Sequence, residues 1–333
     1  MTKRLALAVD GGNSKTDLAL VTSDGEAVAL VRGPRSSPQY LGADGCLDVV
    51  ADLLKQALVD SGVRRTKEPV AEMASLLLAG VDFPAEEREV EVALRARGWA
   101  ARTFVGNDTF AVLRAGTERG WGVAVVCGSG INCVGVSPDG RQVRFPSLGA
   151  ITGDWGGGYD VGLAAVFAAA RSQDGRGPKS SLEQVVPRHF ALETPLELAE
   201  AIHRGLLTQA RAIELAPVVF EEAEHDPVAA EIVARLAGEV VALARVALAR
   251  LDLTREPVEV LLGGGLIQAG DGRLVEAVRS ALTEIGPALS VQRTASSPIV
   301  GAALIALDRL EATSEAKDRA RTELTAMATE AGD

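Results

Sequence analysis

Apolar residues gather into short runs, separated by glycine-bearing turns, in the first part of the chain. The run at 4–9 (RLALAV) is typical of a buried strand and ends at Asp10, and two more runs span 17–22 and 26–32. The last two are joined by Asp-Gly at 24–25, which is a strong hairpin signal between apolar runs. The pattern therefore predicts three strands at the start of the chain.

A helical period follows these strands. Leu47, Val50, Leu54 and Leu58 recur at spacings of three and four, as a helix with one face on a core requires. Further along, the pattern predicts strands at 75–80 and 101–105, a helix that begins at Pro84, and a short helix after Gly106-Asn107-Asp108. Strands that alternate with helices are typical of an α/β fold.

The opening pattern then recurs. Residues 124–143 (AVVCGSGINCVGVSPDGRQV) repeat the order of residues 8–28 (AVDGGNSKTDLALVTSDGEAV): strand, glycine turn, strand, Asp-Gly turn, strand. Two copies of one hairpin unit predict a duplicated α/β domain. The remaining chain is predicted to hold helices over 159–250, about 271–285 and from Pro298, and strands at 257–262 and near 289–293. The charged tail, 314–333, is expected to be a frayed helix or disordered.

Composition narrows the classes of function. A chain of 333 residues is long enough for about two domains. Its formal net charge of −11 argues against a general nucleic-acid or membrane-surface binder, which needs basic patches to meet phosphates. The three histidines and three cysteines form no zinc or iron–sulfur spacing, and we expect the cysteines to be reduced packing residues. Because the segment after Met1 lacks a signal-peptide core and no apolar run has membrane length, we expect a soluble cytoplasmic protein.

Three glycine turns follow apolar strands and are candidates for binding phosphate. They are Gly11-Gly12, Gly128-Ser129-Gly130 and Gly263-Gly264-Gly265. Glycine lets a backbone approach a phosphate closely, and consecutive N–H groups in such a turn form an anion-binding concavity. Ser14 and Ser129 add hydroxyl groups, and Lys15 adds a positive charge. Because neither a Walker A pattern nor a dinucleotide glycine fingerprint is present, the turns predict a nucleotide site of another architecture.

Two aspartates end strands at the same kind of position. Asp10, at the first glycine turn, either holds Mg²⁺ through water or caps the turn. Asp108 follows the strand at 101–105 and precedes a helix, so it is either a helix N-cap or a catalytic base at the carboxyl end of a strand. The residue pattern leaves both pairs of alternatives open.

The densest glycine run of the chain lies at 147–160 (SLGAITGDWGGGYD). It precedes a helix predicted to begin near Tyr159. A rigid polar loop with Asp154 and Trp155 is suited to hydrogen-bond a sugar-like ligand and to shape its pocket. A plain connector is the alternative interpretation.

At these residues the chain resembles the BadF/BadG/BcrA/BcrD-type ATPase family, and within it the eukaryotic-type N-acetylglucosamine kinases of the actin, Hsp70 and hexokinase superfamily. The resemblance runs from about residue 5 to 308. Six ordered blocks carry it: 10–16 (DGGNSKT), 107–108 (ND), 128–132 (GSGIN), 153–157 (GDWGG), 263–265 (GGG) and 298–304 (PIVGAAL). It implies two ribonuclease-H-like (actin-like ATPase) α/β lobes with an interlobe cleft. The expected lobes are 1–118 with about 298–313, and 119–297, followed by the polar tail at 314–333.

The resemblance also implies roles for single residues. Asp108 would be the base that takes a proton from the 6-hydroxyl of a sugar. The sugar-binding residues would be Asn107, Asp108, Asn132, Ser147, Leu148, Gly149, Asp154 and Ser37. The residues around ATP would be Gly11, Gly12, Asn13, Ser14, Lys15, Gly128, Ser129, Gly130, Gly264 and Gly265. The cofactors would be ATP and Mg²⁺, with Asp10 at the metal, and the macromolecular partner would be a second copy of the chain in a homodimer.

The chain departs from the family pattern around the sugar. Ile131 stands where the family has a serine that touches sugar, and Trp155 stands where it has a glutamate. Ser37 and Gln39 occupy the segment in which the family carries a sugar-binding asparagine. The resemblance therefore implies a sugar kinase more firmly than it implies a preference for the N-acetyl group.

Four functions follow from this comparison. The leading expectation is an ATP-dependent 6-kinase of N-acetylglucosamine or a related amino sugar, and glucosamine kinase is the close alternative. An activator ATPase of 2-hydroxyacyl-CoA dehydratase would need cysteines at an interdomain helix junction, which Cys127 and Cys133 do not supply. A non-catalytic sugar or nucleotide sensor is disfavoured because Asp108 and the phosphate loops are present.

Overall fold

The computed structural model describes residues 4–63, 69–270 and 272–330. The chain divides into two units: unit 1 is Met1–Trp121 with Thr294–Asp333, and unit 2 is Gly122–Arg293. The lobe boundaries expected at 118 and 297 lie within a few residues of the two points at which the chain passes from one unit to the other. Met1, where the absence of a signal peptide was expected, lies outside the described residues.

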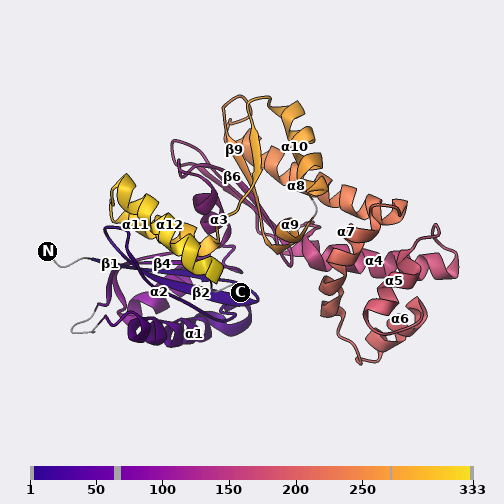
Figure 1. Ribbon diagram of the computed structural model, residues 1–333, viewed down its shortest axis with the longest axis horizontal. Helices are drawn as coiled ribbons and strands as arrows, with labels where there is room; N and C mark the ends of the chain where they lie inside the picture. The colour runs from indigo at the N-terminus through magenta and orange to yellow at the C-terminus, as the bar shows by residue number, and fades with distance from the viewer. Residues whose placement is uncertain (1–3, 64–68, 271, 331–333) are drawn as a thin grey trace. The chain divides into compact units, whose positions relative to one another are not determined.

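A five-stranded sheet forms the centre of unit 1 (Figure 1). Its strands are β1 Leu5–Gly11, β2 Lys15–Thr22, β3 Ala27–Pro34, β4 Ala71–Leu78 and β5 Ala100–Asn107, in the order β3-β2-β1-β4-β5. The β1–β2 and β2–β3 pairs are antiparallel, and the β1–β4 and β4–β5 pairs are parallel. β1 is apolar over residues 5–9 and β2 over residues 18–21, as expected for strands of a sheet that is covered on both faces.

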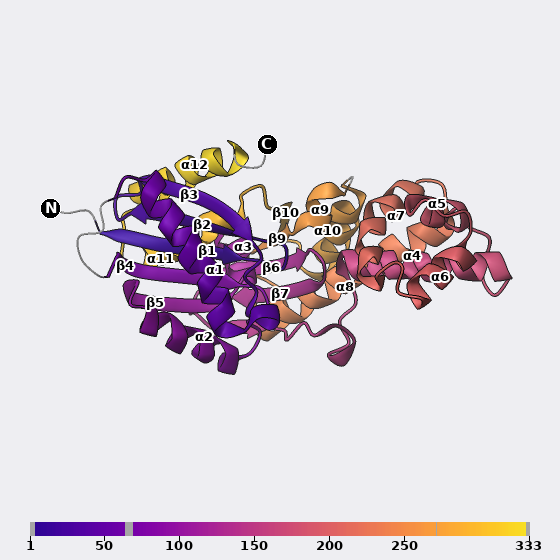
Figure 2. The same cartoon turned by 90° about the horizontal axis from the view of Figure 1, so that it is seen from below.

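Helices cover both faces of this sheet (Figure 2). α1 Pro38–Asp60 and α2 Pro84–Arg97 pack on one face. Leu47, Val50 and Leu54 of α1 are buried in this core, which confirms the helix predicted from their spacing. α11 Pro298–Arg309 packs on the other face, where its Ala306 joins Met73 of β4.

The polar segment after α11 is an ordered helix, so the expectation of a frayed or disordered tail is wrong for its described residues. α12 spans Ser314–Glu330 and buries Ala316, Ala320 and Leu324. The Glu323 carboxylate accepts a hydrogen bond of 2.8 Å from the N–H of Ala27, at the start of β3. The sequence pattern left disorder open because two of the three buried positions are alanine, which gives a weak apolar signal.

The sheet of unit 2 repeats the topology of unit 1. Its strands are β6 Gly122–Cys127, β7 Ile131–Val136, β8 Gln142–Arg144, β9 Glu259–Gly263 and β10 Ser290–Arg293, in the order β10-β9-β6-β7-β8. Read from the β8 edge, this order matches that of unit 1, and the β6–β7 and β7–β8 pairs are again antiparallel whereas β6–β9 and β9–β10 are parallel. The duplicated domain predicted from 8–28 and 124–143 is confirmed.

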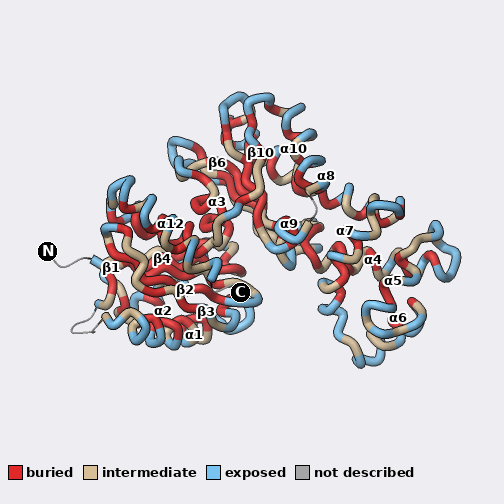
Figure 3. Tube along the Cα trace, in the orientation of Figure 1, coloured by how far each residue is buried: buried red, intermediate tan, exposed pale blue. Residues whose placement is uncertain are grey.

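Unit 2 also carries a helical part, as the pattern over 159–250 predicted. α8 Pro227–Arg250 packs on β6 and β7 and against α10 Arg273–Ile285. The other helices of the unit are α4 Gly157–Asp174, α5 Leu182–His189, α6 Pro195–His203, α7 Ala216–Glu222 and α9 Gly265–Ala269, with 3₁₀ turns at Gly149–Ile151 and Gln209–Leu215. The central strands of both sheets are buried, whereas β5 and β8 carry exposed residues and the outer helices turn an exposed side to solvent (Figure 3). Within the described ranges, no helix has both the length and the apolar character needed to cross a membrane.

Candidate functional site

Three parallel strands of unit 1 end at one edge of its sheet. Gly11 of β1 is level with Leu78 of β4, and Leu78 is level with Asn107 of β5. Asp10 and Asp108, which neighbour the outer two of these residues, therefore lie at the same edge. Open α/β sheets bind their ligands beyond the carboxyl ends of the strands, so this edge is where chemistry is expected.

The first glycine turn joins β1 to β2 at this edge. The N–H of Gly12 donates to the carbonyl of Lys15 at 2.9 Å. A Cβ added to Gly11 would lie 2.4 Å from Cδ2 of Leu78 and 2.6 Å from Oγ of Ser36. A larger residue at position 11 would require the side chains of Leu78 and Ser36 to move, so glycine suits this position.

The polar side chains of this turn differ in their surroundings. Ser14 and Lys15 are exposed, whereas Oδ1 of Asn13 is buried and has no hydrogen-bond partner in the described part of the chain. Nζ of Lys15 lies 3.5 Å from a carboxylate oxygen of Asp17. Arg32 also holds Asp17, with nitrogen–oxygen distances of 2.7 and 3.2 Å. The Lys15 charge is therefore shared with Asp17, which reduces its expected attraction for a phosphate.

The side chain that bonds the first residue of helix α3 (Thr109–Gly116) is that of Asn107, which precedes the N-cap residue Asp108. Oδ1 of Asn107 accepts from the N–H of Thr109 at 3.0 Å and from its hydroxyl at 2.6 Å. Nδ2 of Asn107 donates to Oδ1 of Asp82 at 2.8 Å. Asp108 itself holds the N-cap position, as one of its two interpretations expected, but its side chain makes no capping hydrogen bond, so its role as a base stays a prediction. The Asn107 side chain is engaged within the protein, which is a different task from the predicted sugar contact.

Asp82 is a site residue that the sequence analysis missed. It lies on the loop after β4, where it holds the amide of Asn107, and its own N–H donates to Glu86 at 2.7 Å. The available signal was an acidic residue shortly after the apolar run at 75–80. That signal also fits a simple turn residue, so sequence alone does not separate the two.

Both aspartates at this edge have raised pKa values. Burial raises the pKa of Asp108 to about 6, against the opposing pull of nearby backbone N–H groups. Burial, then the negative charges of Asp108 and Asp17, raise the pKa of Asp10 to about 8 despite two nearby cations. A carboxyl group with a pKa near 6 is mostly ionised at neutral pH and is a better proton acceptor than an ordinary aspartate.

The surroundings of Asp10 fit a bound cation. In the described residues, no group of three or more His, Cys, Asp or Glu side chains could enclose a metal ion. Mg²⁺ does not need one, because it usually keeps several waters and takes one or two protein carboxylates. The Asp10 carboxylate is disfavoured by burial and by its acidic neighbours, and a cation would relieve both effects.

Ser37 joins two loops of unit 1 by a hydrogen bond. It is fully buried, and its hydroxyl donates to the carbonyl of Ala79 at 2.9 Å. A Cβ on Gly80 would lie 2.8 Å from Cβ of Gln39, so the two loops are in close contact. The Ser37 hydroxyl therefore serves the loop after β4, rather than pointing outward as a sugar ligand would.

The second and third glycine turns meet at the corresponding edge of the unit 2 sheet. Val126 of β6 is level with Gly263 of β9, so the turn at 128–130 and Gly264 follow at the same edge. A Cβ on Gly264 would lie 2.2 Å from the carbonyl oxygen of Cys127, and the φ angle of Gly264 is +95°. Ser129, Gly130 and Gly265 are exposed. The structure thus brings the predicted phosphate loop and adenosine motif together.

Helix α4 begins against the 128–130 turn. The N–H groups of Gly158 and Tyr159 donate to the carbonyls of Gly128 and Ser129 at 2.8 and 3.0 Å. A Cβ on Gly157 would lie 2.4 Å from the backbone of Gly130. The glycine run is therefore not a plain connector, because its bare backbone is what allows this contact.

The predicted sugar loop holds its own shape through short polar contacts. The N–H of Asp154 donates to the carbonyl of Gly149 at 3.0 Å, and the N–H of Leu148 donates to the Thr152 hydroxyl at 2.9 Å. The Thr152 hydroxyl in turn donates to the Asp154 carboxylate. Oγ of Ser147 is buried and has no partner among the described residues. The predicted loop residues are thus gathered in one compact turn.

Strand β7 follows the 128–130 turn, and its first residue contacts the glycine run. The side chain of Ile131 packs against Gly156, where an added Cβ would approach it to 3.1 Å. Asn132 is half-buried, and its Oδ1 accepts from the N–H of Cys133 at 2.7 Å. Ile131, which stands where the family has a serine, is therefore a packing residue here, and the sugar contact of Asn132 stays a prediction.

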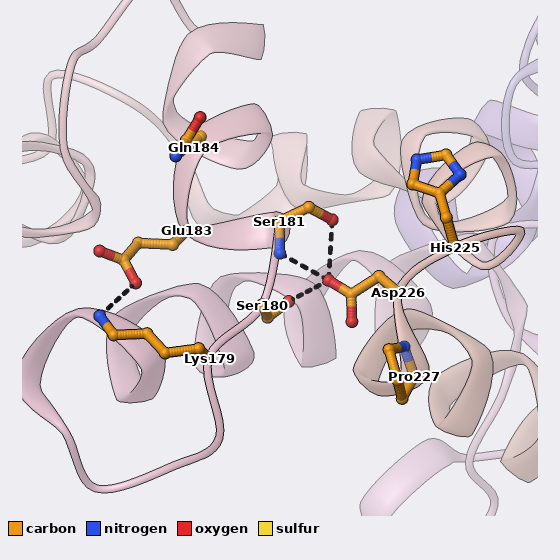
Figure 4. A pocket seen from close by; sticks show the side chains of 8 residues that line it. All are labelled: Lys179, Ser180, Ser181, Glu183, Gln184, His225, Asp226 and Pro227. Carbon is orange, nitrogen blue, oxygen red and sulfur yellow. Dashed lines mark hydrogen bonds and ion pairs between the residues drawn. The ribbon is translucent and has the colours of Figure 1, made fainter.

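A separate pocket of about 460 Å³ lies in the helical part of unit 2 (Figure 4). It is lined by Lys179, Ser180, Ser181, Glu183, Gln184, His225, Asp226 and Pro227. Asp226 accepts hydrogen bonds of 2.6 Å from the Ser180 hydroxyl and from the Ser181 N–H, and it caps α8 through the N–H of Val228 at 2.7 Å. These bonds join the starts of two helices, and no predicted site residue lines the pocket.

The three cysteines are buried and free, as expected for packing thiols. Burial raises the pKa of the Cys127 thiol to about 12, which makes it unreactive at neutral pH. Cys127 lies on β6 and Cys133 on β7, within one sheet.

Comparison with known proteins agrees with this architecture. An N-acetylmuramic acid/N-acetylglucosamine kinase from Clostridium acetobutylicum is 28% identical over 267 residues, covering 79% of this chain and 86% of that protein. An N-acetyl-D-glucosamine kinase from Dictyostelium discoideum is 26% identical over 326 residues, covering 92% and 99%. A crystal structure from Chromobacterium violaceum, of a protein whose proposed activity is that of an N-acetylglucosamine kinase, aligns with a TM-score of 0.73 and 26% identity over 92% of this chain and 100% of that one.

The fold and the family of the chain are both shown by these comparisons. The two-lobed, actin-like sugar kinase fold implied by the resemblance is confirmed by this structural alignment and by the repeated sheet topology. The BadF/BadG/BcrA/BcrD ATPase family matches residues 7–306, which is most of the chain. The protein is therefore a member of the BadF/BadG/BcrA/BcrD ATPase family.

Proposed function

We propose that this protein transfers the γ-phosphoryl group of ATP to the 6-hydroxyl of N-acetylglucosamine or a related amino sugar. The observation that carries the proposal is Asp108. It lies at the carboxyl edge of the unit 1 sheet, its side chain makes no capping bond, and burial raises its pKa to about 6. The names of the two relatives, both kinases of N-acetylated amino sugars, support the choice of substrate class.

In this proposal Asp108 accepts the proton of the sugar hydroxyl as that oxygen attacks phosphorus. Asn107 positions Asp108 by bonding the first residue of α3, and Asp82 positions Asn107. Phosphoryl transfer depends chiefly on aligned oxygens and neutralised charge, so a well-placed carboxylate acceptor is the main chemical group required.

The glycine turns are proposed to hold the nucleotide. Backbone N–H groups of the turns at 11–15 and 128–130 would contact the phosphates, with the exposed hydroxyls of Ser14 and Ser129 beside them. Gly264 and Gly265 would lie along adenosine. Mg²⁺ held near Asp10 would neutralise charge on the phosphates when it is bound.

The sugar is proposed to lie on the loop formed by 147–154, with Asn132 beside it. The buried Ser147 hydroxyl, which has no partner among the described residues, supports a ligand there. The Asp154 carboxylate, already in contact with Thr152, would accept from sugar hydroxyls. A homodimer and a cytoplasmic location stay predictions of the same account.

A coupled ADP-release assay tests the proposal. ATP and Mg²⁺ are supplied with N-acetylglucosamine, glucosamine, N-acetylmannosamine, N-acetylmuramic acid or glucose in turn. We expect sugar-dependent ADP release with the N-acetylated amino sugars. A rate greatest with glucosamine would instead favour the glucosamine kinase alternative. ATP hydrolysis at one rate with every sugar and with none would contradict the kinase proposal.

A further inference from the structure

Another pocket, of about 800 Å³, lies in unit 1 at the end of helix α3 that is opposite Asp108. Arg114, in the last turn of α3, lines it together with the segment 118–120 and with residues of α11 and α12. We call it the α3–α12 pocket. Its volume falls within the range of about 300–1,000 Å³ that is usual for ligand pockets. No residue proposed to bind ATP or sugar lines it, so a ligand here would occupy a separate site.

Three cations in this pocket share one carboxylate. Asp308 of α11 pairs with Arg114 at 2.7 Å and with Lys317 of α12 at 2.8 Å. Arg321, one turn further along α12, forms no ion pair within the described ranges. These four side chains, which we call the inner group, have a formal charge of +2. Because Arg114 is buried and Lys317 and Arg321 are half-buried, water screens these cations only in part.

Arg321 is held in place by backbone carbonyls. Its Nη1 donates to the carbonyl of Ala115, and its Nη2 donates to the carbonyl of Thr117 at 3.4 Å. These bonds use two of the five N–H donors of a guanidinium, and a carbonyl dipole does not neutralise a full charge. Burial, then the charge of Arg114, lower the pKa of Arg321 against the pull of nearby carboxylates. An anion in the pocket would relieve both effects.

The rim of the α3–α12 pocket has the opposite balance of charge. Glu118, Arg119 and Asp318 line the pocket, and all three are exposed. Water screens charges at an exposed rim more than it screens the half-buried cations behind them. The pocket is therefore suited to an anion that reaches the inner group, and the two rim carboxylates limit its affinity.

We propose that the α3–α12 pocket binds the phosphate group of a small phosphomonoester. Such a group carries about −1.5 to −2 charges at pH 7 and has three acceptor oxygens, which matches the charge of the inner group and the donors of Arg321 and Lys317. A single carboxylate would leave part of that charge unmatched. The sugar or nucleoside that carries the phosphate would fill the remaining volume. This site goes beyond the proposed function, and its ligand binds whether or not the chain is a kinase.

Isothermal titration calorimetry of the full chain tests the proposal with three probes. Inorganic phosphate has the phosphate group alone, N-acetylglucosamine 6-phosphate is a phosphomonoester of a sugar, and AMP is one of a nucleoside. We expect at least one ester to bind more tightly than inorganic phosphate, because the pocket has room for the organic part. The ester with the lower Kd shows which source of phosphate the pocket prefers.

Two variants show whether the probe lies in this pocket. Arg321→Gln removes a charge from the inner group and should raise the Kd about 10- to 100-fold, as the loss of a hydrogen bond to a charged group implies. Glu118→Gln removes a negative charge from the rim and should lower the Kd about 2- to 5-fold, which is a gain that misfolding would not produce. Arg319→Gln is the matched control on α12, because Arg319 pairs with Glu323 at 2.7 Å and does not line the pocket. It should leave the Kd unchanged.

Three results would overturn the proposal. The first is that wild type binds none of the probes. The second is one Kd shared by wild type, Arg321→Gln and Glu118→Gln, since the probe would then lie elsewhere. The third is binding of inorganic phosphate without either ester. None of these results bears on the kinase proposal, and a chain that lacks sugar-dependent ADP release leaves the titrations valid.

Discussion

The carboxyl groups of Asp10 and Asp108 lie at one edge of the unit 1 sheet and interact. Burial and then the charge of Asp108 raise the pKa of Asp10 to about 8. Burial also raises the pKa of Asp108, but only to about 6. At neutral pH the pair therefore holds about one proton and one negative charge between its two carboxyl groups. In the proposed function this difference suits the two groups to separate tasks: Asp108 would accept a proton, and Asp10 would ionise when a cation binds.

The pH dependence of turnover should report Asp108. The base must be ionised to accept a proton, so kcat should fall as pH drops through about 6, by tenfold per unit well below that value. Asp108→Asn should lower kcat by about 10²- to 10⁴-fold while sugar binding, followed by calorimetry, stays largely intact. Near-normal turnover in this variant would show that another group is the base.

Asp10 should destabilise the metal-free protein at high pH. Its folded pKa of about 8 is above the ordinary value of 3.8, so between these values the folded state holds a proton that the unfolded chain has released. The free energy of unfolding therefore decreases as pH rises from about 4 to 8. Asp10→Asn stays neutral, and urea unfolding should find it more stable than wild type by about 1–4 kcal/mol at pH 8.5 without metal.

Wild type and Asp10→Asn, compared at a lower pH and with added Mg²⁺, supply the control. At pH 4 both Asp10 and its replacement are neutral in the folded state, so the two should unfold almost alike. Added Mg²⁺ at pH 8.5 should stabilise wild type more than Asp10→Asn. Equal stability of the two proteins at pH 8.5 without metal would argue that burial and the acidic neighbours do not raise the pKa of Asp10.

Asn107 should affect both stability and turnover. Asn107→Ala removes the cap on Thr109 and the partner of Asp82, and it should lower the free energy of unfolding by about 1 kcal/mol. It should also lower kcat, because the backbone that carries Asp108 is no longer held. Thr194→Ala is the matched control, since Thr194 caps α6 through the N–H of Glu197 at 3.2 Å, away from the sheet edge. If Asn107→Ala loses stability and keeps kcat, Asn107 does not position Asp108.

Two adjacent glycines should respond differently to substitution. Gly264 has φ +95°, and an added Cβ would lie 2.2 Å from the carbonyl of Cys127, so Gly264→Ala should destabilise the fold by about 2–4 kcal/mol. Gly265 begins α9 and an added Cβ meets nothing within 4 Å, so Gly265→Ala should change stability by less than about 1 kcal/mol. Denaturant unfolding compares them directly, and equal stability of the two variants would contradict the described packing.

Much of the fold was readable from local patterns. The strands at the start of the chain, the helix over Leu47 to Leu58 and the repeat of 8–28 in 124–143 all follow from apolar spacing and Asp-Gly turns. These signals are local and strong, since a buried strand needs an unbroken apolar run. The packing of α12 was not predicted, because its buried face is mainly alanine and its contact with Ala27 joins residues far apart in the sequence.

The site was predictable in part. Glycine turns after strands indicated where phosphate could bind, and the strand ends indicated Asp10 and Asp108. The hydrogen-bond partners of the polar side chains could not be predicted, because these partners are distant in sequence. Asn107 bonds Asp82, and Ser37 bonds the carbonyl of Ala79. Trp155 was noted as a departure from the family, but its stacking on Arg235 required the packing of α8.

The central claim is that this chain is a sugar 6-kinase, and the most direct test follows all products of one reaction by ³¹P NMR. Protein, ATP and Mg²⁺ are mixed with N-acetylglucosamine, and a parallel sample omits the sugar. The account predicts one ADP for each sugar phosphate formed, a phosphoryl group on the 6-oxygen, and no reaction without sugar. Release of inorganic phosphate at the same rate in both samples, with no sugar phosphate, would contradict it.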